Sequence, residues 1–152
     1  SQGFDISEPY VVSPEVKNPR AAFIFDGIDR SVIGDFGLAG GGAAGLEVDR
    51  ADADQGTPDH ALILASSTRH TDIYLMTPED LLDPTPDWSG TQCDIIRADL
   101  TFFETPGGGA VFSVGSIAWP GSIAWNTYDN EIAQITENVL KRFNDPVRFE
   151  MP

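Results

Sequence analysis

The sequence predicts a domain of the α/β class, or α+β for this chain taken alone, and three observations lead to that class. Two β-rich runs, 94–105 and 110–119, flank the turn Pro106-Gly107-Gly108-Gly109, a connection typical of an antiparallel hairpin. Six glycines stand among the twelve residues 34–45, which predicts a loop. Apolar residues near the C-terminus recur with helical spacing. We therefore expect a mixed sheet with an antiparallel hairpin, a glycine-rich loop and a long C-terminal helix.

The composition limits the classes of protein to which the chain can belong. The 152 residues, 41% of them hydrophobic, are enough for one globular domain with a core. The formal net charge of −15 repels a nucleic-acid backbone, so we expect no nucleic-acid partner. No stretch reaches the roughly 20 apolar residues of a membrane helix. Residues 1–12 have no basic segment followed by an apolar one, so we expect no export signal. With Cys93 as its single cysteine, the chain is expected in the cytoplasm and away from membranes.

The N-terminal part of the chain predicts an arm, a strand and a loop. Residues 1–20 contain three prolines and few periodic apolar positions, so we expect an extended arm on the surface. The apolar run 21–28 (AAFIFDGI) reads as a buried strand. The glycine-rich loop follows, and its backbone is expected to approach another group closely.

The middle of the chain predicts a second strand with a partner. Residues 46–53 are short and ambiguous and allow at most a brief helix. The run 60–67 (HALILASS) reads as a buried strand, with 72–77 (DIYLMT) as its hairpin partner. Residues 78–82 look like one helical turn.

The C-terminal segment is predicted to be a helix that packs on the core. Five apolar residues recur at offsets of three, four and seven: Ile132, Ile135, Val139, Leu140 and Phe143. Asp129 or Asn130 can cap its start, and Glu131 suits the first turn. Lys141 and Arg142 suit the last turn, where cations interact favourably with the helix dipole.

The glycine-rich loop formally matches a dinucleotide-binding motif. Gly40, Gly41, Gly42 and Gly45 satisfy G-x-G-x-x-G. The residues before them do not form a convincing strand, and the segment after them is short and acidic. A nucleotide site is therefore not favoured, and the four glycines are kept as the candidate wall of a small-molecule pocket.

Histidines and aspartates of this sequence do not have the spacing of metal ligands. Asp49, Asp52 and Asp54 break the register of a calcium loop and predict a solvated acidic loop. His60 and His70 are ten residues apart, which matches neither a helical pair nor a zinc finger. We expect His60 to bond to backbone at the end of a strand.

Glu47 is the candidate catalytic residue. It follows directly from the glycine-rich loop, where a carboxylate lies beside exposed backbone with little steric cover. Such a position suits a general base or a group that supports one. The alternative is a surface glutamate at the start of a short helix.

Two long runs carry a resemblance to a known family. The segments GGGAAGLEVDRADADQGTPDHALILASSTRHTDIY and RADLTFFETPGGGAVFSVGSIAWPGSIAWNTYDNEIAQITENVLKRF resemble the C-terminal region of the large (β) subunit of the N,N-dimethylformamidase family. The similarity runs from Pro19 to about Phe143. A glycine is expected where this sequence has Arg69.

The resemblance implies an activity, a cofactor and a fold. The family hydrolyses N,N-dimethylformamide to dimethylamine and formate at a mononuclear iron held by two tyrosines and one glutamate. Those ligands are expected upstream of the matched region, so this chain itself is expected to hold no metal ligand. The family's catalytic domain is similar to the glutamine-amidotransferase-like α/β fold. By position, Glu47 matches the glutamate implicated at the family's active site, where it would take a proton from the attacking water.

The resemblance also implies how the chain is organised and what it assembles with. Residues 1–20 are expected as an arm and 21–152 as a single domain. The chain is expected to be the last part of a larger catalytic subunit and to be inactive by itself. The expected partners are the upstream part of that subunit and a small subunit, with oligomer formation. Two alternatives stay open: a non-catalytic assembly module of the large subunit, and a small-molecule-binding domain that uses the glycine loop.

Overall fold

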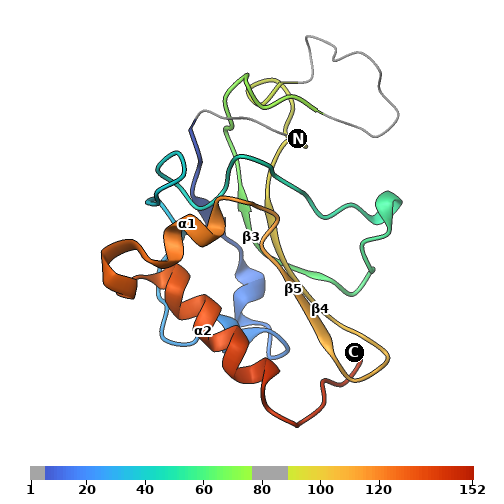
Figure 1. Cartoon of the computed structure of the whole chain (residues 1–152). Coiled ribbons are helices and arrows are strands. Elements are labelled where there is room, and N and C mark those ends of the chain that lie inside the picture. Colours follow the sequence, from blue (N-terminus) through green and yellow to red (C-terminus); the bar gives the residue numbers. More distant parts are fainter. Residues whose placement is uncertain (1–5, 77–88) are drawn as a thin grey trace.

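The fold is built on a five-stranded antiparallel sheet, seen in a computed structural model that describes residues 6–76 and 89–152 (Figure 1). The strand order is β2-β1-β3-β4-β5. The strands are β1 (Tyr10–Val12), β2 (Val32–Ile33), β3 (Leu62–Ser67), β4 (Asp99–Glu104) and β5 (Ala110–Ser113). All four strand pairings are antiparallel, so the prediction of a mixed sheet is wrong. A parallel pair needs a long crossover, usually a helix, and the one long helix of the described residues follows the last strand.

Two α-helices and four short 3₁₀ helices complete the described part of the chain. The α-helices are α1 (Trp119–Ile123) and α2 (Glu131–Phe143), and the 3₁₀ helices are η1 (Pro14–Lys17), η2 (Ala22–Phe25), η3 (Ala53–Gln55) and η4 (Trp125–Tyr128). The predicted C-terminal helix is confirmed as α2, and Asn130 is its cap: the Asn130 side chain accepts the Ala133 N–H at 2.9 Å. Across the described residues, no helix combines the length and the apolar character needed to cross a membrane.

The N-terminal arm contributes a strand to the interior of the sheet. Residues Tyr10–Val12 are extended, as expected, but they pair with β2 on one side and with β3 on the other. Tyr10 is fully buried, and its hydroxyl donates to the Val114 carbonyl at 2.6 Å. This segment therefore does not lie along the surface as the prolines predict.

The predicted strand over 21–28 is wrong, because this apolar run forms η2. A strand would send consecutive side chains to opposite faces, whereas Ile24 and Phe25 are both buried in the same core cluster. The turn starts at Asn18, whose carbonyl accepts the N–H groups of Ala21 and Ala22 at 2.9 Å each. Packing between the sheet and α2 thus overrides the β propensity of the run.

The predicted strand 60–67 is confirmed as β3, but the hairpin partner assigned to it is wrong. Both edges of β3 are occupied, by β1 and by β4, so residues 72–76 have no edge to pair with. Residues 72–73 form a turn, and Leu75 makes an isolated bridge with Ser89. Thr77 and the helical turn predicted at 78–82 lie outside the described residues.

The predicted hairpin between the two C-terminal β-rich runs is confirmed as β4–β5. Glu104 pairs with Ala110, and Thr105 N–H donates to the Gly109 carbonyl at 2.9 Å to close the turn. The C-terminal segment returns to this turn, where Phe149 N–H donates to the Gly108 carbonyl at 2.9 Å (Figure 1). The resemblance of this sheet to part of a glutamine-amidotransferase-like domain stays a prediction.

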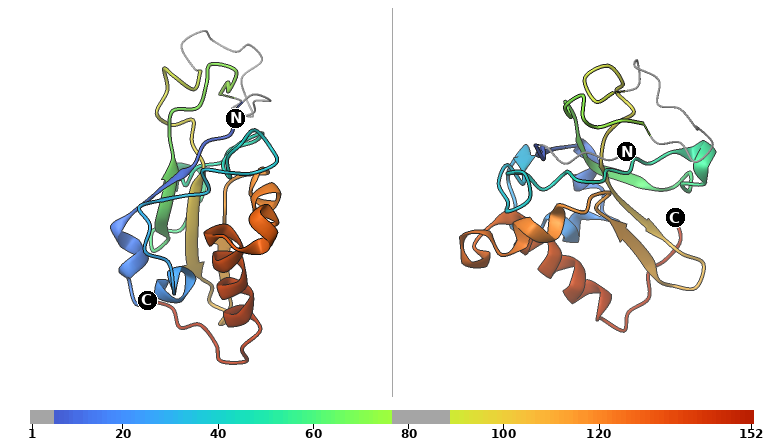
Figure 2. Two further views of the ribbon diagram at one scale, coloured as in Figure 1. Left: turned by 90° about the vertical axis from the view of Figure 1, so that its left-hand side faces the viewer. Right: turned by 45° about the horizontal axis from the view of Figure 1, so that its top comes forward.

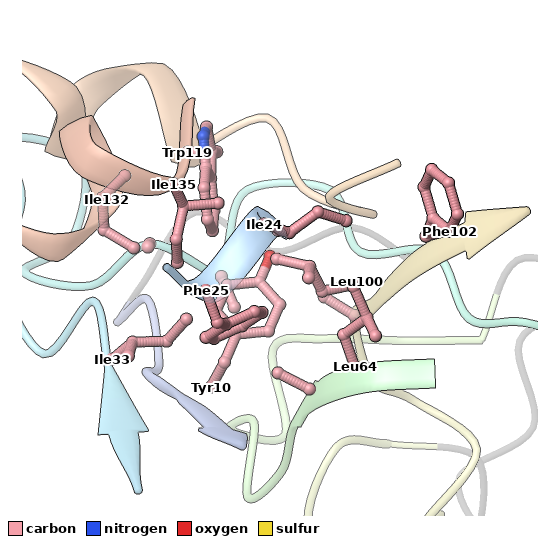
Figure 3. Packing of buried hydrophobic residues seen from close by; sticks show 14 of the residues in the cluster. Tyr10, Ile24, Phe25, Ile33, Leu64, Leu100, Phe102, Trp119, Ile132 and Ile135 are labelled. Atoms are coloured by element: carbon pink, nitrogen blue, oxygen red, sulfur yellow. The ribbon is translucent and has the colours of Figure 1, made fainter. Parts of the chain in front are cut away.

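The core lies between the sheet and the two α-helices, which pack on one side of it (Figure 2). Figure 3 shows Trp119, Ile132 and Ile135 pointing from the helices toward the strands. The Trp119 ring meets the Tyr10 ring edge-to-face at 5.7 Å between centroids. The chain from β2 to β3 leaves this core as the glycine-rich loop and then passes beside residues 115–118, which places Glu47 at its edge.

Candidate functional site

The glycine-rich loop packs closely on the chain's own N-terminal segment. Glu8 and Ala44 exchange two backbone hydrogen bonds, at 2.7 and 2.9 Å, and Ser7 N–H donates to the Gly40 carbonyl at 3.0 Å. A Cβ at Gly42 or Gly45 would clash with Ser7. The expected close approach is therefore confirmed, and the approached group is residues 7–8.

The four candidate glycines divide into two pairs. Gly42 and Gly45 are buried against the N-terminal segment. Gly40 and Gly41 are exposed and adopt positive φ, +72° and +80°, which glycine tolerates at no steric cost. Of the four, only this second pair faces outward, so it is the part that can meet a ligand or another polypeptide.

After a turn at Leu46, residues 47–49 are held beside residues 115–118. Val48 makes an antiparallel bridge with Ser116, and Asp49 N–H donates to the Gly115 carbonyl at 2.9 Å. Ile117 N–H donates to the Glu47 carbonyl at 3.3 Å. Glu47 is thus not at the start of a short helix, and that alternative is wrong.

A strained turn at Leu46 sets the position of Glu47. The Glu47 N–H donates to the Gly45 carbonyl at 2.8 Å, and Leu46 between them has φ +64°. A three-residue turn with a left-handed central residue is rare, and leucine adopts it only where surrounding contacts impose it. Strained backbone of this kind concentrates at functional sites, where neighbouring structure offsets its cost.

Two hydroxyl groups hold this turn. The Ser116 hydroxyl accepts the Gly45 N–H at 2.8 Å and the Ala118 N–H at 3.0 Å. The Tyr74 hydroxyl accepts the Leu46 N–H at 2.9 Å. The backbone on which Glu47 stands is therefore fixed by contacts with two separate parts of the chain.

The Glu47 carboxylate itself is left free by the residues that the structure describes. Its side chain is half-buried, and it makes no hydrogen bond or ion pair within 6–76 and 89–152. A carboxylate without such a partner can accept a proton from a water molecule or bind a positively charged group. Of the candidate residues, Glu47 is the one with this chemistry.

Sequence reasoning missed a buried group of side chains behind the turn. His70 is fully buried, and its Nε2 is hydrogen-bonded to Ser67 Oγ at 2.7 Å. The His70 and Tyr74 rings lie 4.6 Å apart between centroids. Burial lowers the pKa of His70 to about 4, so the ring is neutral at neutral pH. No motif spacing links these residues to Glu47, because the contact runs through the Leu46 backbone.

The other histidine and Arg69 have structural explanations. His60 Nε2 lies 3.0 Å from the Glu104 carbonyl, which confirms the expected bond to backbone at a strand end. Arg69 has φ +66°, a conformation that favours glycine. This accounts for the glycine expected at that position.

In the acidic loop formed by Asp49, Asp52 and Asp54, the Asp52 side chain stabilises the local fold. The Asp52 carboxylate accepts the Asp54 N–H at 3.0 Å at the start of η3 and pairs with Arg50 at 2.5 Å. The Arg50 hydrogen bond holds the pKa of Asp52 below its usual value. Over 6–76 and 89–152, no three His, Cys, Asp or Glu side chains gather as a set that could ligate a metal.

The fold and the site define an antiparallel α+β domain in which Glu47 stands on a fixed backbone turn directly after a glycine-rich loop. A sequence profile of the family described as "N,N-dimethylformamidase beta subunit-like, C-terminal" matches residues 1–130, and the chain belongs to this family.

Two relatives carry the name of one enzyme subunit. The chain is 48% identical over 144 residues to the N,N-dimethylformamidase beta subunit of Paracoccus aminophilus, and 46% identical over 144 residues to the N,N-dimethylformamidase beta subunit of an Alcaligenes species. Each match covers 94% of this chain and 19% of the relative. The chain therefore spans about a fifth of the length of the curated relatives it matches.

Proposed function

We propose that this chain is the C-terminal part of an amide-hydrolysing large subunit that acts on N,N-dimethylformamide, and that Glu47 is its general base. The observation that carries the proposal is the Glu47 carboxylate, whose backbone is fixed at a strained turn and which has no partner among the described residues. Identities of 46% and 48% to the two N,N-dimethylformamidase beta subunits supply the substrate class.

The proposed step is a proton transfer in two stages. The Glu47 carboxylate takes a proton from water as the water oxygen bonds to the formyl carbon of the amide. The C–N bond then breaks, and Glu47 returns the proton to the leaving nitrogen, which departs as dimethylamine. The other product is formic acid, which passes its proton to the amine or to water and leaves as formate. Glu47 ends the cycle as a carboxylate, so its charge and the protons of the reaction balance.

We propose that iron belongs to the upstream part of the subunit. Among the described residues, no three His, Cys, Asp or Glu side chains gather as a possible ligand set, and the resemblance implies ligands upstream of this chain. In the complete subunit, bound iron would act as a Lewis acid on the amide carbonyl. Glu47 itself would only accept and return the proton.

We also propose that the upstream part of the large subunit and a small subunit are the partners of this chain in a cytoplasmic oligomer, and that the chain alone is inactive. Large apolar side chains at its surface favour assembly: Leu38 is 78% exposed and Leu140 is 57% exposed. The same observation supports the second candidate function, a non-catalytic assembly module in which Glu47 has no role.

The variant Glu47→Gln in the complete enzyme separates the two candidates. We expect the kcat for N,N-dimethylformamide to fall by about 10²-fold or more, because the glutamine side chain cannot accept the proton from water. Iron content and assembly should stay unchanged. Glu137→Gln is the matched control, since Glu137 lies on the exposed face of α2 in an ion pair with Lys141. Unchanged turnover of Glu47→Gln would leave only the assembly module.

A further inference from the structure

We infer that Tyr74 is a positioning residue for Glu47: its hydroxyl holds the Leu46 backbone in the strained turn that aims the carboxylate. The inference rests on the proposed role of Glu47 and adds the residue on which that role depends. Tyr74 is fully buried and stands outside the loop that it holds, 28 residues away in the sequence.

The Leu46 turn needs an external partner to persist. A left-handed backbone is sterically unfavourable for a non-glycine residue, because its Cβ comes too close to the following carbonyl oxygen. The Tyr74 hydroxyl offsets this cost by accepting the Leu46 N–H at 2.9 Å. Without that acceptor, Leu46 loses the contact that fixes its N–H, and the turn can relax toward an ordinary conformation.

The Tyr74 ring is itself held in place by a connected set of buried groups. It packs against the His70 ring at 4.6 Å between centroids, and the His70 ring bonds to Ser67 Oγ at the end of β3. The Ala98 N–H in turn donates to Ser67 Oγ at 2.8 Å. The Tyr74 N–H donates to the Thr71 carbonyl at 3.0 Å. The sheet therefore sets the position of the Tyr74 hydroxyl, and the hydroxyl sets that of Leu46.

The opposite side of the turn is held independently. Ser116 bonds to both the N–H and the carbonyl of Gly45, at 2.8 and 3.2 Å. Loss of the Tyr74 contact would consequently leave Gly45 in place and let Leu46 and Glu47 move. A shift of about 1 Å in a catalytic group can cost 10²-fold in rate, so the hydroxyl should matter for kcat rather than for folding.

Tyr74→Phe in the complete enzyme, with both subunits, tests the inference. The variant keeps the ring packing and removes only the hydroxyl. We expect kcat for N,N-dimethylformamide to fall at least tenfold, with KM within twofold and with iron content and assembly unchanged. Tyr128→Phe is the matched control: Tyr128 is 66% exposed and lies on η4, and its variant should keep wild-type kcat. A Tyr74→Phe enzyme with wild-type kcat would overturn the inference.

The double variant Tyr74→Phe/Glu47→Gln distinguishes positioning from a general structural role. If Tyr74 acts through Glu47, then adding Tyr74→Phe to Glu47→Gln should change kcat less than twofold. An equal drop in both backgrounds would mean that Tyr74 supports the fold alone, and would overturn the inference. Wild-type turnover by Glu47→Gln would instead reject the proposed function, and the positioning role with it.

A second variant keeps the test decisive if Tyr74→Phe weakens the subunit. Leu46→Gly removes the steric cost of the left-handed backbone. Combined with Tyr74→Phe, it should recover at least threefold of the lost kcat, because the turn no longer needs the hydroxyl. No recovery in an assembled, iron-containing double variant would contradict a role for Tyr74 in holding the turn.

Discussion

The carboxylates of this domain differ in whether the chain supplies their partners. Glu104 is almost fully buried and accepts two hydrogen bonds from Arg20, at 2.9 and 2.5 Å, which lower its pKa. Asp99 is also buried, and it accepts the Ser66 hydroxyl at 2.6 Å together with the Arg97 guanidinium. These two acids hold the fold together, whereas Glu47 is fixed through its backbone and its carboxylate has no partner within 6–76 and 89–152.

His70 predicts a measurable pH dependence of stability. Its folded pKa of about 4 lies below the ordinary value of 6.5, so between these pH values the unfolded chain binds a proton that the folded chain does not. The free energy of unfolding should fall as the pH falls from 6.5 to 4, by at most about 1.4 kcal/mol per pH unit from this residue. Urea unfolding of this chain across that range measures the slope.

The variant His70→Gln isolates this contribution, because glutamine carries no titrating group. The slope between pH 6.5 and 4 should become smaller in the variant. Equal slopes in the two proteins would show that His70 titrates alike in the folded and unfolded chain, and would contradict its burial as a neutral ring.

At the scale of elements, the connection from α1 to α2 depends on one side chain. The three residues of 126–128 have positive φ, between +49° and +68°, although none is glycine. Asn130 follows them, and its amide donates to the Ile123 and Trp125 carbonyls at 3.1 and 2.7 Å while its carbonyl oxygen caps α2. One residue thus closes the connection and starts the helix.

Asn130→Ala should lower the free energy of unfolding by about 1–2 kcal/mol, because it removes the helix cap and both of these bonds. Asn144→Ala is the control, since that side chain makes one exposed bond to the Leu140 carbonyl and its loss should cost under about 0.5 kcal/mol. Denaturant unfolding of this chain and the two variants gives the comparison. Equal losses would show that Asn130 acts as an ordinary surface residue.

The sequence predicts well those elements that local patterns determine. The α2 helix has both a cap and a periodic apolar face, and the β4–β5 hairpin has its Pro-Gly-Gly-Gly turn. The run 21–28 is predicted wrongly because its apolar composition suits a strand and a buried 3₁₀ turn equally. Residues 72–76 are predicted wrongly because β1, from the supposed arm, occupies the edge of β3 that they would need.

At the scale of the whole molecule, the candidate site can be predicted only in part from the sequence. Glu47 is predictable because it follows the glycine-rich loop directly. Tyr74 and His70 cannot be predicted in this way, because their connection to Glu47 depends on the fold, which brings Tyr74 beside Leu46. We propose that the exposed Gly40 and Gly41 form one side of the site, and that the remaining four-fifths of the related subunits supplies the rest.

The most direct measurement is hydrolysis of N,N-dimethylformamide, with iron content, by this purified 152-residue chain and by the complete enzyme side by side. If the chain contributes one carboxylate to a site completed elsewhere, we expect iron and turnover in the complete enzyme and neither in the chain alone. Stoichiometric iron together with turnover in the chain alone would contradict such a composite site and show that these residues contain all of it.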